Sequence, residues 1–281
     1  MLNDHPPVWP LTDLVIFDCD STLSRVEGIN ELARLTGTTT DVAALTQRAM
    51  NGEVPLESVY AYRLRTSNPT QAQVSHLRRV YRENVITDAR EVVTALQDLG
   101  CKVFIVSGGL YDPVRDFGVW LDIPRDHIYA VDMEYDQLAG RWWRYWEQPG
   151  GQNPNANYLA VKSSPLTATG GKRVLIERIR GRFPGRAMLV GDGMSDLEAQ
   201  SEVDLFVGFG GVVYREQVAE RAPIYIKTPH LSPILSLALA RLANVAQWRY
   251  LFDEGLERIE RGEVNFHDFA VREMFLAAIR R

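Results

Sequence analysis

Apolar and polar residues form two kinds of pattern along this chain: short apolar runs and longer amphipathic segments. The first apolar run, residues 14–17 (LVIF), is too short for a helix and suits a buried parallel strand. Asp18 and Asp20 follow it, and strand alternation points both carboxylates to the same side. Ser21 and Thr22 add hydroxyls where the chain must turn. Taken alone, the two acids could be turn formers and helix caps, or they could form a paired acid site at a strand end.

Residues 25–85 show helical rather than strand periodicity. Four short helices are predicted: one that carries Ile29, Leu32 and Leu35 and ends at Gly37, one capped by Asp41 and ended by Gly52, one opened by Pro55, and one introduced by a capping box of Thr70 and Gln73. We therefore expect a helical-bundle cap at 25–85, inserted into a core formed by residues 1–24 and 86–281.

From residue 88 onward, helical and strand patterns alternate, which predicts an α/β core with a Rossmann-like parallel sheet. The expected helices are 88–99 and 172–183, and the expected strands are 102–106, 187–190, 205–211 and 223–227. Two of these strands run into polar, glycine-rich segments, predicted as loops, at 107–109 (SGG) and 191–196 (GDGMSD). Such loops at strand ends are where open α/β sheets bind ligands.

Three later segments are less regular. Residues 128–146 alternate like a β-hairpin that turns at Ala139-Gly140, and the aromatic residues of its return strand are expected to pack over the sheet rather than to form a ligand platform. Residues 147–171 resemble a mobile surface loop. The last fifty residues are helical by pattern and are expected outside the sheet. Their apolar faces, within 231–281, should pack on the core or on a second subunit, so a homodimer is one alternative.

Composition narrows the classes of function. The chain has 281 residues, a net charge of -5 and no concentrated Lys/Arg run, which argues against a nucleic-acid or membrane-surface partner and favours a small-molecule substrate. Its N-terminus lacks the features of a secretion signal, and Arg241 interrupts the most apolar later stretch, residues 231–245. The two cysteines, Cys19 and Cys101, form neither a disulfide framework nor a zinc site. We expect a cytoplasmic protein.

The strand ends would gather four carboxylates in one crevice, from Asp18, Asp20, Asp192 and Asp196. Lys172 is their only direct counter-charge. Each pair of like charges 4 Å apart costs about 4 kcal/mol at an effective dielectric constant of 20, so the crevice needs a cation before it can accept an anionic substrate. An all-oxygen site with room for water suits Mg²⁺.

The remaining polar residues suit phosphoryl transfer. Backbone N–H groups and a hydroxyl could bind phosphate oxygens, from Ser107, Gly108 and Gly109. Asp18 could attack phosphorus and become an aspartyl phosphate. Asp20 could then protonate the leaving alcohol and later activate water. Taken alone, Lys172 could be a solvated lysine, and Asp192 and Asp196 a turn residue and a cap, but clusters in this order make coincidence a poor explanation.

These segments resemble the four motifs of the haloacid dehalogenase superfamily, and specifically the phosphoserine phosphatases: DCDST, Ser107 in VSGG, Lys172 in GGK, and GDGMSD. The likeness runs from about Val15 to Tyr225 and includes VGFGGVVYREQV. It implies that Asp18, Asp192 and the backbone carbonyl of Asp20 ligate Mg²⁺. It also implies that Ser107 and Lys172 hold the phosphoryl group, and that Asp196 supports the metal site and Lys172. We expect Thr22 to support the site as well.

The predicted cap resembles the substrate-reading domain of the same family. The resemblance implies that Glu27 faces the ammonium group of the substrate, that Arg63 faces its carboxylate, and that Met50 packs nearby. Without the family, Glu27 could be a first-turn dipole partner and Arg63 an exposed helix residue. Three departures leave the substrate preference open: Leu56 where the family commonly has Phe, a longer segment at 142–169, and the extension at 231–281.

The expected function is Mg²⁺-dependent hydrolysis of L-phosphoserine, a reaction of serine biosynthesis. The same chemistry on another small phosphomonoester is the nearest alternative. A non-catalytic phosphate-binding protein on this fold is disfavoured because all the residues of the four motifs are present. A phosphonate-cleaving enzyme is disfavoured because that branch of the superfamily replaces the second acid, whereas Asp20 remains.

Overall fold

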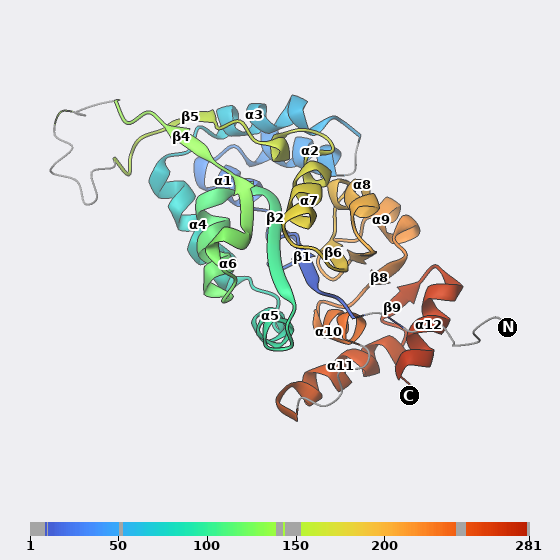
Figure 1. Ribbon diagram of the computed structural model, residues 1–281. Helices are drawn as coiled ribbons and strands as arrows, with labels where there is room; N and C mark the ends of the chain where they lie inside the picture. The colour runs from blue at the N-terminus through green and yellow to red at the C-terminus, as the bar shows by residue number, and fades with distance from the viewer. Residues whose placement is uncertain are drawn as a thin grey trace.

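A mostly parallel sheet forms the centre of the chain (Figure 1). The computed structural model describes residues 9, 11–50, 53–138, 143, 153–239 and 246–279. Within these residues the sheet has seven strands, in the order β3 (Ile128–Val131), β2 (Lys102–Leu110), β1 (Leu14–Phe17), β6 (Ala187–Gly191), β7 (Leu205–Phe209), β8 (Ile224–Ile226) and β9 (Val264–Phe266). All neighbours pair in parallel except β8 and β9. The prediction of an α/β fold with a parallel sheet is confirmed.

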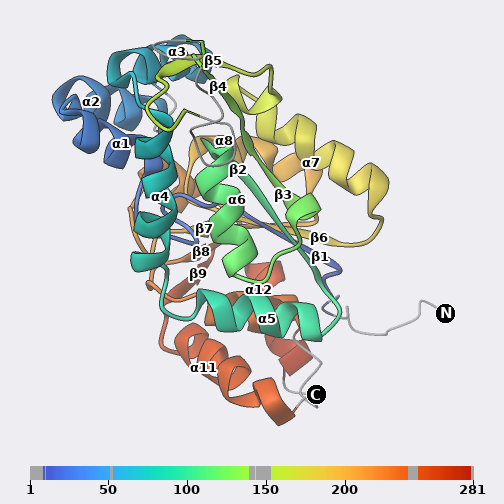
Figure 2. The same ribbon diagram turned by 90° about the vertical axis from the view of Figure 1, so that its left-hand side faces the viewer.

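Helices cover both faces of this sheet (Figures 1 and 2). One group follows the strand connections that run from β1 to β3, and consists of α5 (Ala89–Asp98) and α6 (Tyr111–Trp120). The other group follows the connections that run from β3 to β6 and on to β8, and consists of α7 (Gly171–Arg182), α8 (Met194–Glu198) and α9 (Glu216–Arg221). The two sets of connections run across the sheet in opposite directions. Because crossovers between parallel strands are right-handed, the two groups of helices lie on opposite faces of the sheet.

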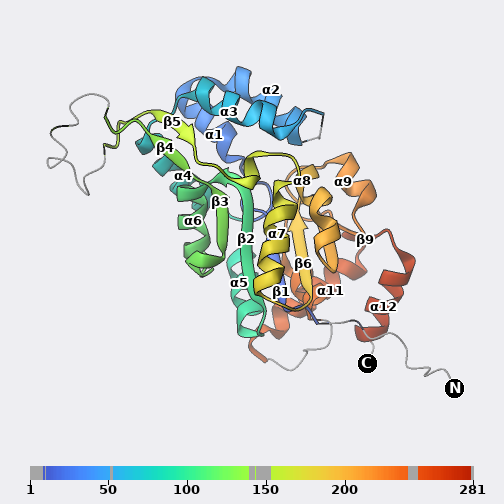
Figure 3. The same cartoon turned by 45° about the horizontal axis from the view of Figure 1, so that its top comes forward.

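The helices predicted between residues 25 and 85 are present; the first three lie over the carboxyl end of the sheet, and the fourth packs beside α6 (Figures 2 and 3). They are α1 (Gly28–Thr36), α2 (Thr39–Met50), α3 (Leu56–Ser67) and α4 (Gln71–Glu83). Gly37 ends α1 in the left-handed conformation, at φ 74°, and the Thr70–Gln73 capping box opens α4, as expected. The cap predicted at Asp41 is wrong, because α2 begins at Thr39. Gly52 lies outside the described residues.

The predicted loop after the second strand is also wrong. β2 continues through Ser107, Gly108 and Gly109 and ends only at Leu110. Its pairing with β1 stops at Ile105, and its register with β3 shifts before Leu110. The glycine-rich segment therefore remains extended beyond the pairing with β1, within the irregular part of the pairing with β3, and projects toward the helices above it.

The hairpin predicted over residues 128–146 is wrong in its pairing. β3 joins the main sheet, while β4 (Met133–Tyr135) pairs antiparallel with β5 (Tyr158–Val161), inside the stretch predicted as a loop. The turn at residues 139 and 140 and most of the aromatic return lie outside the described residues. Trp143 is described and exposes 52% of its surface, so packing over the sheet does not hold for it.

The C-terminal segment packs on the core and also extends the sheet, through α10 (Ser232–Ala238), α11 (Arg249–Glu260), β9 and α12 (Phe269–Ile279). The expectation that it lies outside the sheet is wrong, because β9 pairs with β8. Its packing on the core is confirmed, since Leu235, Leu239 and Leu251 are buried in the hydrophobic core. None of the described helices is both long and apolar enough to cross a membrane.

Candidate active site

A cavity of about 240 Å³ lies between the strand ends and helices α1–α3. From the core it is lined by residues that follow β1, lie on β2, or begin α7, namely Asp18, Asp20, Ser107 and Lys172. From the helices above, it is lined by Glu27 just before α1 and by Tyr60 and Arg63 on α3. The structure thus brings together predicted residues that are far apart in the sequence, because the carboxyl ends of parallel strands share one edge of the sheet.

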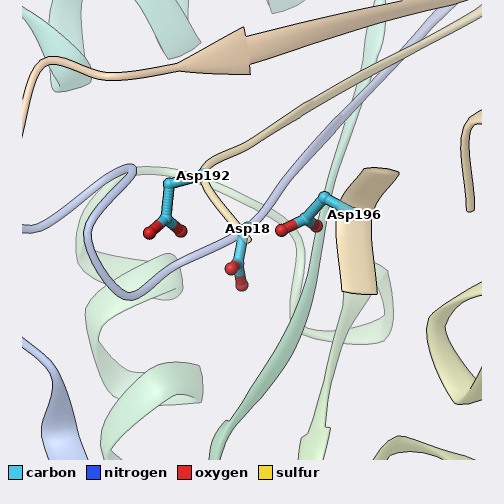
Figure 4. A group of neighbouring side chains, drawn as sticks. All are labelled: Asp18, Asp192 and Asp196. Carbon is cyan, nitrogen blue, oxygen red and sulfur yellow. The ribbon is translucent and has the colours of Figure 1, made fainter. Parts of the chain in front are cut away.

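Three carboxylates converge at the floor of the site (Figure 4). One oxygen from each of Asp18, Asp192 and Asp196 lies within 4.8 Å of the others, and all three residues are buried. Burial raises the pKa of both Asp192 and Asp196 to about 7, and neighbouring carboxylates add to the effect. A group of carboxylate oxygens this close is the kind of ligand set that Mg²⁺ prefers.

Lys172 links two of these carboxylates. Its ammonium group lies 2.9 Å from Asp18 Oδ2 and 2.7 Å from Asp196 Oδ1, and the lysine is 5% exposed. Burial alone would lower the pKa of Lys172, but the two carboxylates hold it well above its ordinary value. The other oxygen of Asp196 accepts from the Gly193 N–H at 3.2 Å, so Asp196 is engaged on both sides.

Asp20 is held from the helical side of the cavity. The Tyr81 hydroxyl donates to Asp20 Oδ1 at 2.5 Å, and the Gly28 N–H donates to Oδ2 at 3.0 Å. A Cβ at position 28 would overlap the Tyr81 hydroxyl, so this close approach requires glycine. Burial raises the pKa of Asp20 to about 7. This carboxyl can therefore gain and lose a proton near neutral pH.

Arg215 is another buried cation of the site, and the sequence analysis did not predict it. Its Nε lies 2.9 Å from Asp192 Oδ2 and its Nη2 lies 3.5 Å from Glu27 Oε1. Glu27 also accepts from the Ser21 hydroxyl at 2.9 Å, and burial raises the pKa of Glu27 to about 8. Its Oε2 is buried and has no hydrogen-bond partner among the described residues.

Arg63 is buried rather than exposed, at 3%. Its Nη1 donates to the Thr46 hydroxyl at 3.2 Å, and its guanidinium lies 5.5 Å from the centre of the Tyr60 ring. Its Nε is buried without a partner among the described residues. The Thr22 hydroxyl is buried without a described partner in the same way. The side chain of Met50, which ends α2, lies outside what the structure describes.

The end of β2 forms the remaining wall. Ser107 is fully buried, and its Oγ accepts from the Gly109 N–H at 3.0 Å. The carbonyl of Gly108 accepts from the Tyr60 hydroxyl at 2.8 Å. A side chain of α3 is thus hydrogen-bonded directly to the glycine-rich end of the strand.

The family model of the haloacid dehalogenase-like hydrolases matches residues 12–204. The chain belongs to the haloacid dehalogenase-like hydrolases. It is 33% identical over 216 residues to a phosphoserine phosphatase of Homo sapiens, covering 76% of this chain and 88% of that protein. It is 32% identical over 218 residues to a chloroplastic phosphoserine phosphatase of Arabidopsis thaliana, covering 76% of this chain and 68% of that protein.

Solved structures agree on the fold of this hydrolase. A phospho-aspartyl intermediate analogue of phosphoserine phosphatase superimposes with a TM-score of 0.65 at 23% identity, covering 81% of this chain and 99% of that one. A substrate-bound phosphoserine phosphatase complex gives the same TM-score and identity, with 98% of that chain covered. The expected resemblance is confirmed, and the protein is a phosphoserine phosphatase-like hydrolase.

The charge balance of the hydrolase site differs from the sequence expectation. Glu27 adds a fifth carboxylate to the four expected at the strand ends, and Arg215 joins Lys172 as a direct counter-charge. The carboxylates still outnumber these two cations, so the argument for a bound metal cation holds.

Two further residues of this hydrolase site carried weak signals in the sequence. Arg215 follows an apolar strand and directly precedes α9, but a buried arginine has the same local pattern as a solvated one. Tyr81 lies on the buried face of α4 with Val74 and Leu77, yet its hydroxyl also contacts Asp20. A periodic pattern predicts which face of a helix is buried, but it does not predict which group the hydroxyl of a buried tyrosine contacts.

Proposed function

We propose that this hydrolase cleaves a phosphomonoester through an aspartyl phosphate on Asp18 with the help of Mg²⁺, and that its substrate is L-phosphoserine. The observation that carries the proposal is the joint burial of Asp18, Asp20 and Lys172 around one cavity, with Lys172 2.9 Å from Asp18. The Asp18 carboxylate lies beside the Lys172 ammonium group, while burial raises the pKa of Asp20 to about 7. These are the properties needed for a nucleophile and an acid/base.

In this mechanism Asp18 attacks phosphorus while the alkoxide departs. Asp20, protonated at its raised pKa, gives its proton to the leaving oxygen. It then takes a proton from the water that attacks the aspartyl phosphate. Lys172 and the hydroxyl of Ser107 hold the phosphoryl oxygens. Asp196 keeps Lys172 in place by accepting a hydrogen bond at 2.7 Å.

Asp18, Asp192 and the backbone carbonyl of Asp20 would hold the metal. The donor set fits Mg²⁺, because Asp18 and Asp192 offer buried carboxylate oxygens close together. When bound, the cation supplies positive charge beside the transferred phosphoryl group. Thr22, whose hydroxyl has no described partner, would support this loop.

The choice of L-phosphoserine rests on the two cap residues that line the cavity from above. Glu27 Oε2 and Arg63 Nε are buried, belong to opposite charges, and have no hydrogen-bond partner among the described residues. An ammonium group and a carboxylate of a bound ligand would satisfy both atoms. The relatives named phosphoserine phosphatases point the same way. The segment 25–85 would then be the substrate-reading cap domain, with Met50 beside the ligand.

The test is a steady-state screen of phosphomonoesters with purified protein, with Mg²⁺ or with excess chelator. We expect phosphoserine to give the highest kcat/KM, and chelation to abolish turnover. Asp18→Asn should remove activity, because it deletes the nucleophile, whereas Asp20→Asn should slow both proton-transfer steps. Full activity in chelator would contradict the metal, and a clear preference for another ester would leave the phosphatase chemistry but reject phosphoserine.

A further inference from the structure

Tyr60 joins the two halves of the cavity. It lies on α3, is 6% exposed, and lines the cavity. The hydroxyl donates to the carbonyl of Gly108 on β2 at 2.8 Å. Burial holds the pKa of this hydroxyl above its ordinary value, so it remains a donor at any working pH. The contact is therefore a fixed link from helix to strand.

The peptide between Gly108 and Gly109 carries this link further. No peptide bond of the described chain is cis, and in a trans peptide the C=O and N–H groups point in opposite directions. With its carbonyl held toward α3 by Tyr60, this peptide directs the Gly109 N–H away from α3. That N–H donates to Ser107 Oγ at 3.0 Å.

The hydroxyl of Ser107 is thereby oriented. Its oxygen accepts from Gly109, and it donates to no protein group among the described residues. Ser107 is fully buried within the protein and lines the cavity, so the remaining place for its O–H is a ligand in that cavity. A donor facing the cavity is what a phosphoryl oxygen requires.

We propose that Tyr60 is a positioning residue for the reaction, which sets the Ser107 hydroxyl as a phosphoryl donor through the Gly108–Gly109 peptide. The ring of the same residue lies beneath the guanidinium of Arg63 at 5.5 Å, so Tyr60 also supports the group proposed to read the substrate carboxylate. The proposal rests on the proposed function only in that a phosphoryl group lies against Ser107. It does not depend on which ester is the natural substrate.

Tyr60→Phe separates the two roles, because it removes the hydroxyl and keeps the ring. We expect kcat/KM to fall about tenfold, the scale of one hydrogen bond, and equally for phosphoserine and for an aryl phosphate. The inhibition constant of inorganic phosphate, measured against the aryl ester, should rise in parallel. Tyr62→Phe is the matched control, since Tyr62 lies on the same helix and is 53% exposed, and it should match the wild type.

A double-mutant cycle with Ser107→Ala tests the path. If Tyr60 acts through Ser107, Tyr60→Phe should have no further effect in the Ser107→Ala background. A loss of equal size in both backgrounds would overturn the proposal, as would wild-type kinetics of Tyr60→Phe. The thermal midpoints of all variants show whether each is folded. If phosphoserine is not the substrate, the wild-type enzyme will prefer an aryl ester in the substrate screen. That result would not change the interpretation of the double-mutant cycle.

Discussion

Arg215 shows how one side chain can set the ionisation of its neighbours. Burial raises the pKa of Asp192 to about 7 and that of Glu27 to about 8, and Arg215 opposes both shifts through its contacts at 2.9 and 3.5 Å. It therefore lowers the pH at which these two buried acids ionise. The arginine connects the proposed metal site to the proposed ammonium site.

We expect Arg215→Gln to move the acidic limb of the kcat/KM pH profile to higher pH. Loss of the positive charge removes an influence that lowers the pKa of Asp192, so a higher pH is needed to ionise it. The measurement is the profile from about pH 5 to pH 9 with saturating Mg²⁺. Arg221→Gln is the control, because Arg221 is exposed at the end of α9. An unmoved limb would mean that Arg215 only stabilises the fold.

The selectivity of the site should depend on Arg63. Arg63→Ala is expected to lower kcat/KM for phosphoserine by about 2 kcal/mol or more, roughly 30-fold, while it barely affects an aryl phosphate. Glu27→Gln should likewise lower kcat/KM for phosphoserine and barely affect the aryl phosphate, because each residue would bind one charged group of the amino-acid moiety. Arg65→Ala, at an exposed position of the same helix, should change neither substrate. Equal losses on both substrates would favour a broader phosphomonoesterase.

At the scale of elements, Asp88 joins the start of α5 to the start of α10. Its two carboxylate oxygens accept from the N–H groups of Leu231, at 2.9 Å, and Ser232, at 2.8 Å, and Asp88 is 6% exposed. The first N–H groups of a helix have no partner within it, so a buried helix start needs an acceptor of this kind. The C-terminal helices are thereby tied to the core.

Asp88→Ala should lower the free energy of unfolding by about 2 kcal/mol, because it leaves buried N–H groups unpaired. Asp88→Asn should cost less, since one carbonyl oxygen remains to accept a hydrogen bond. Urea denaturation of the three proteins measures the difference. Equal midpoints for wild type and Asp88→Ala would show that water or the chain itself satisfies these donors.

At the scale of the whole molecule, the buried acids of the site make stability depend on pH and on metal. Burial raises the pKa of Asp20, Asp192 and Asp196 to about 7 in the folded protein. The folded state therefore binds these protons more tightly than the unfolded chain. The contribution to stability is complete below the ordinary carboxyl pKa, near pH 4, and is lost as pH rises through about 7.

We expect the stability of the metal-free wild type, relative to Asp192→Asn, to fall as pH rises from about 5 to 8. The amide of Asn cannot ionise, so it does not share this loss. Mg²⁺ should increase the stability of the wild type most at the upper end of this pH range, because it binds the ionised carboxylates. Thermal midpoints with chelator and with Mg²⁺ provide the measurement. A difference that is constant with pH would contradict burial as the cause.

The sequence by itself determined those features that depend on near neighbours. The apolar run of β1, the glycine that ends α1 and the capping box of α4 are all local signals, and each was correct. The positions of Asp18, Ser107 and Asp192 at one edge also followed, because a parallel sheet brings its strand ends together whatever the details of packing.

Only the tertiary structure decided which distant residues meet. β5 pairs with β4 and β9 with β8, although their local patterns suggested a loop and a helical tail. The contacts of Arg215 with Asp192 and of Tyr60 with Gly108 are of the same kind. Short strands and polar side chains take their partners from the packing of the whole chain, because burial and hydrogen-bond satisfaction depend on what surrounds them in space.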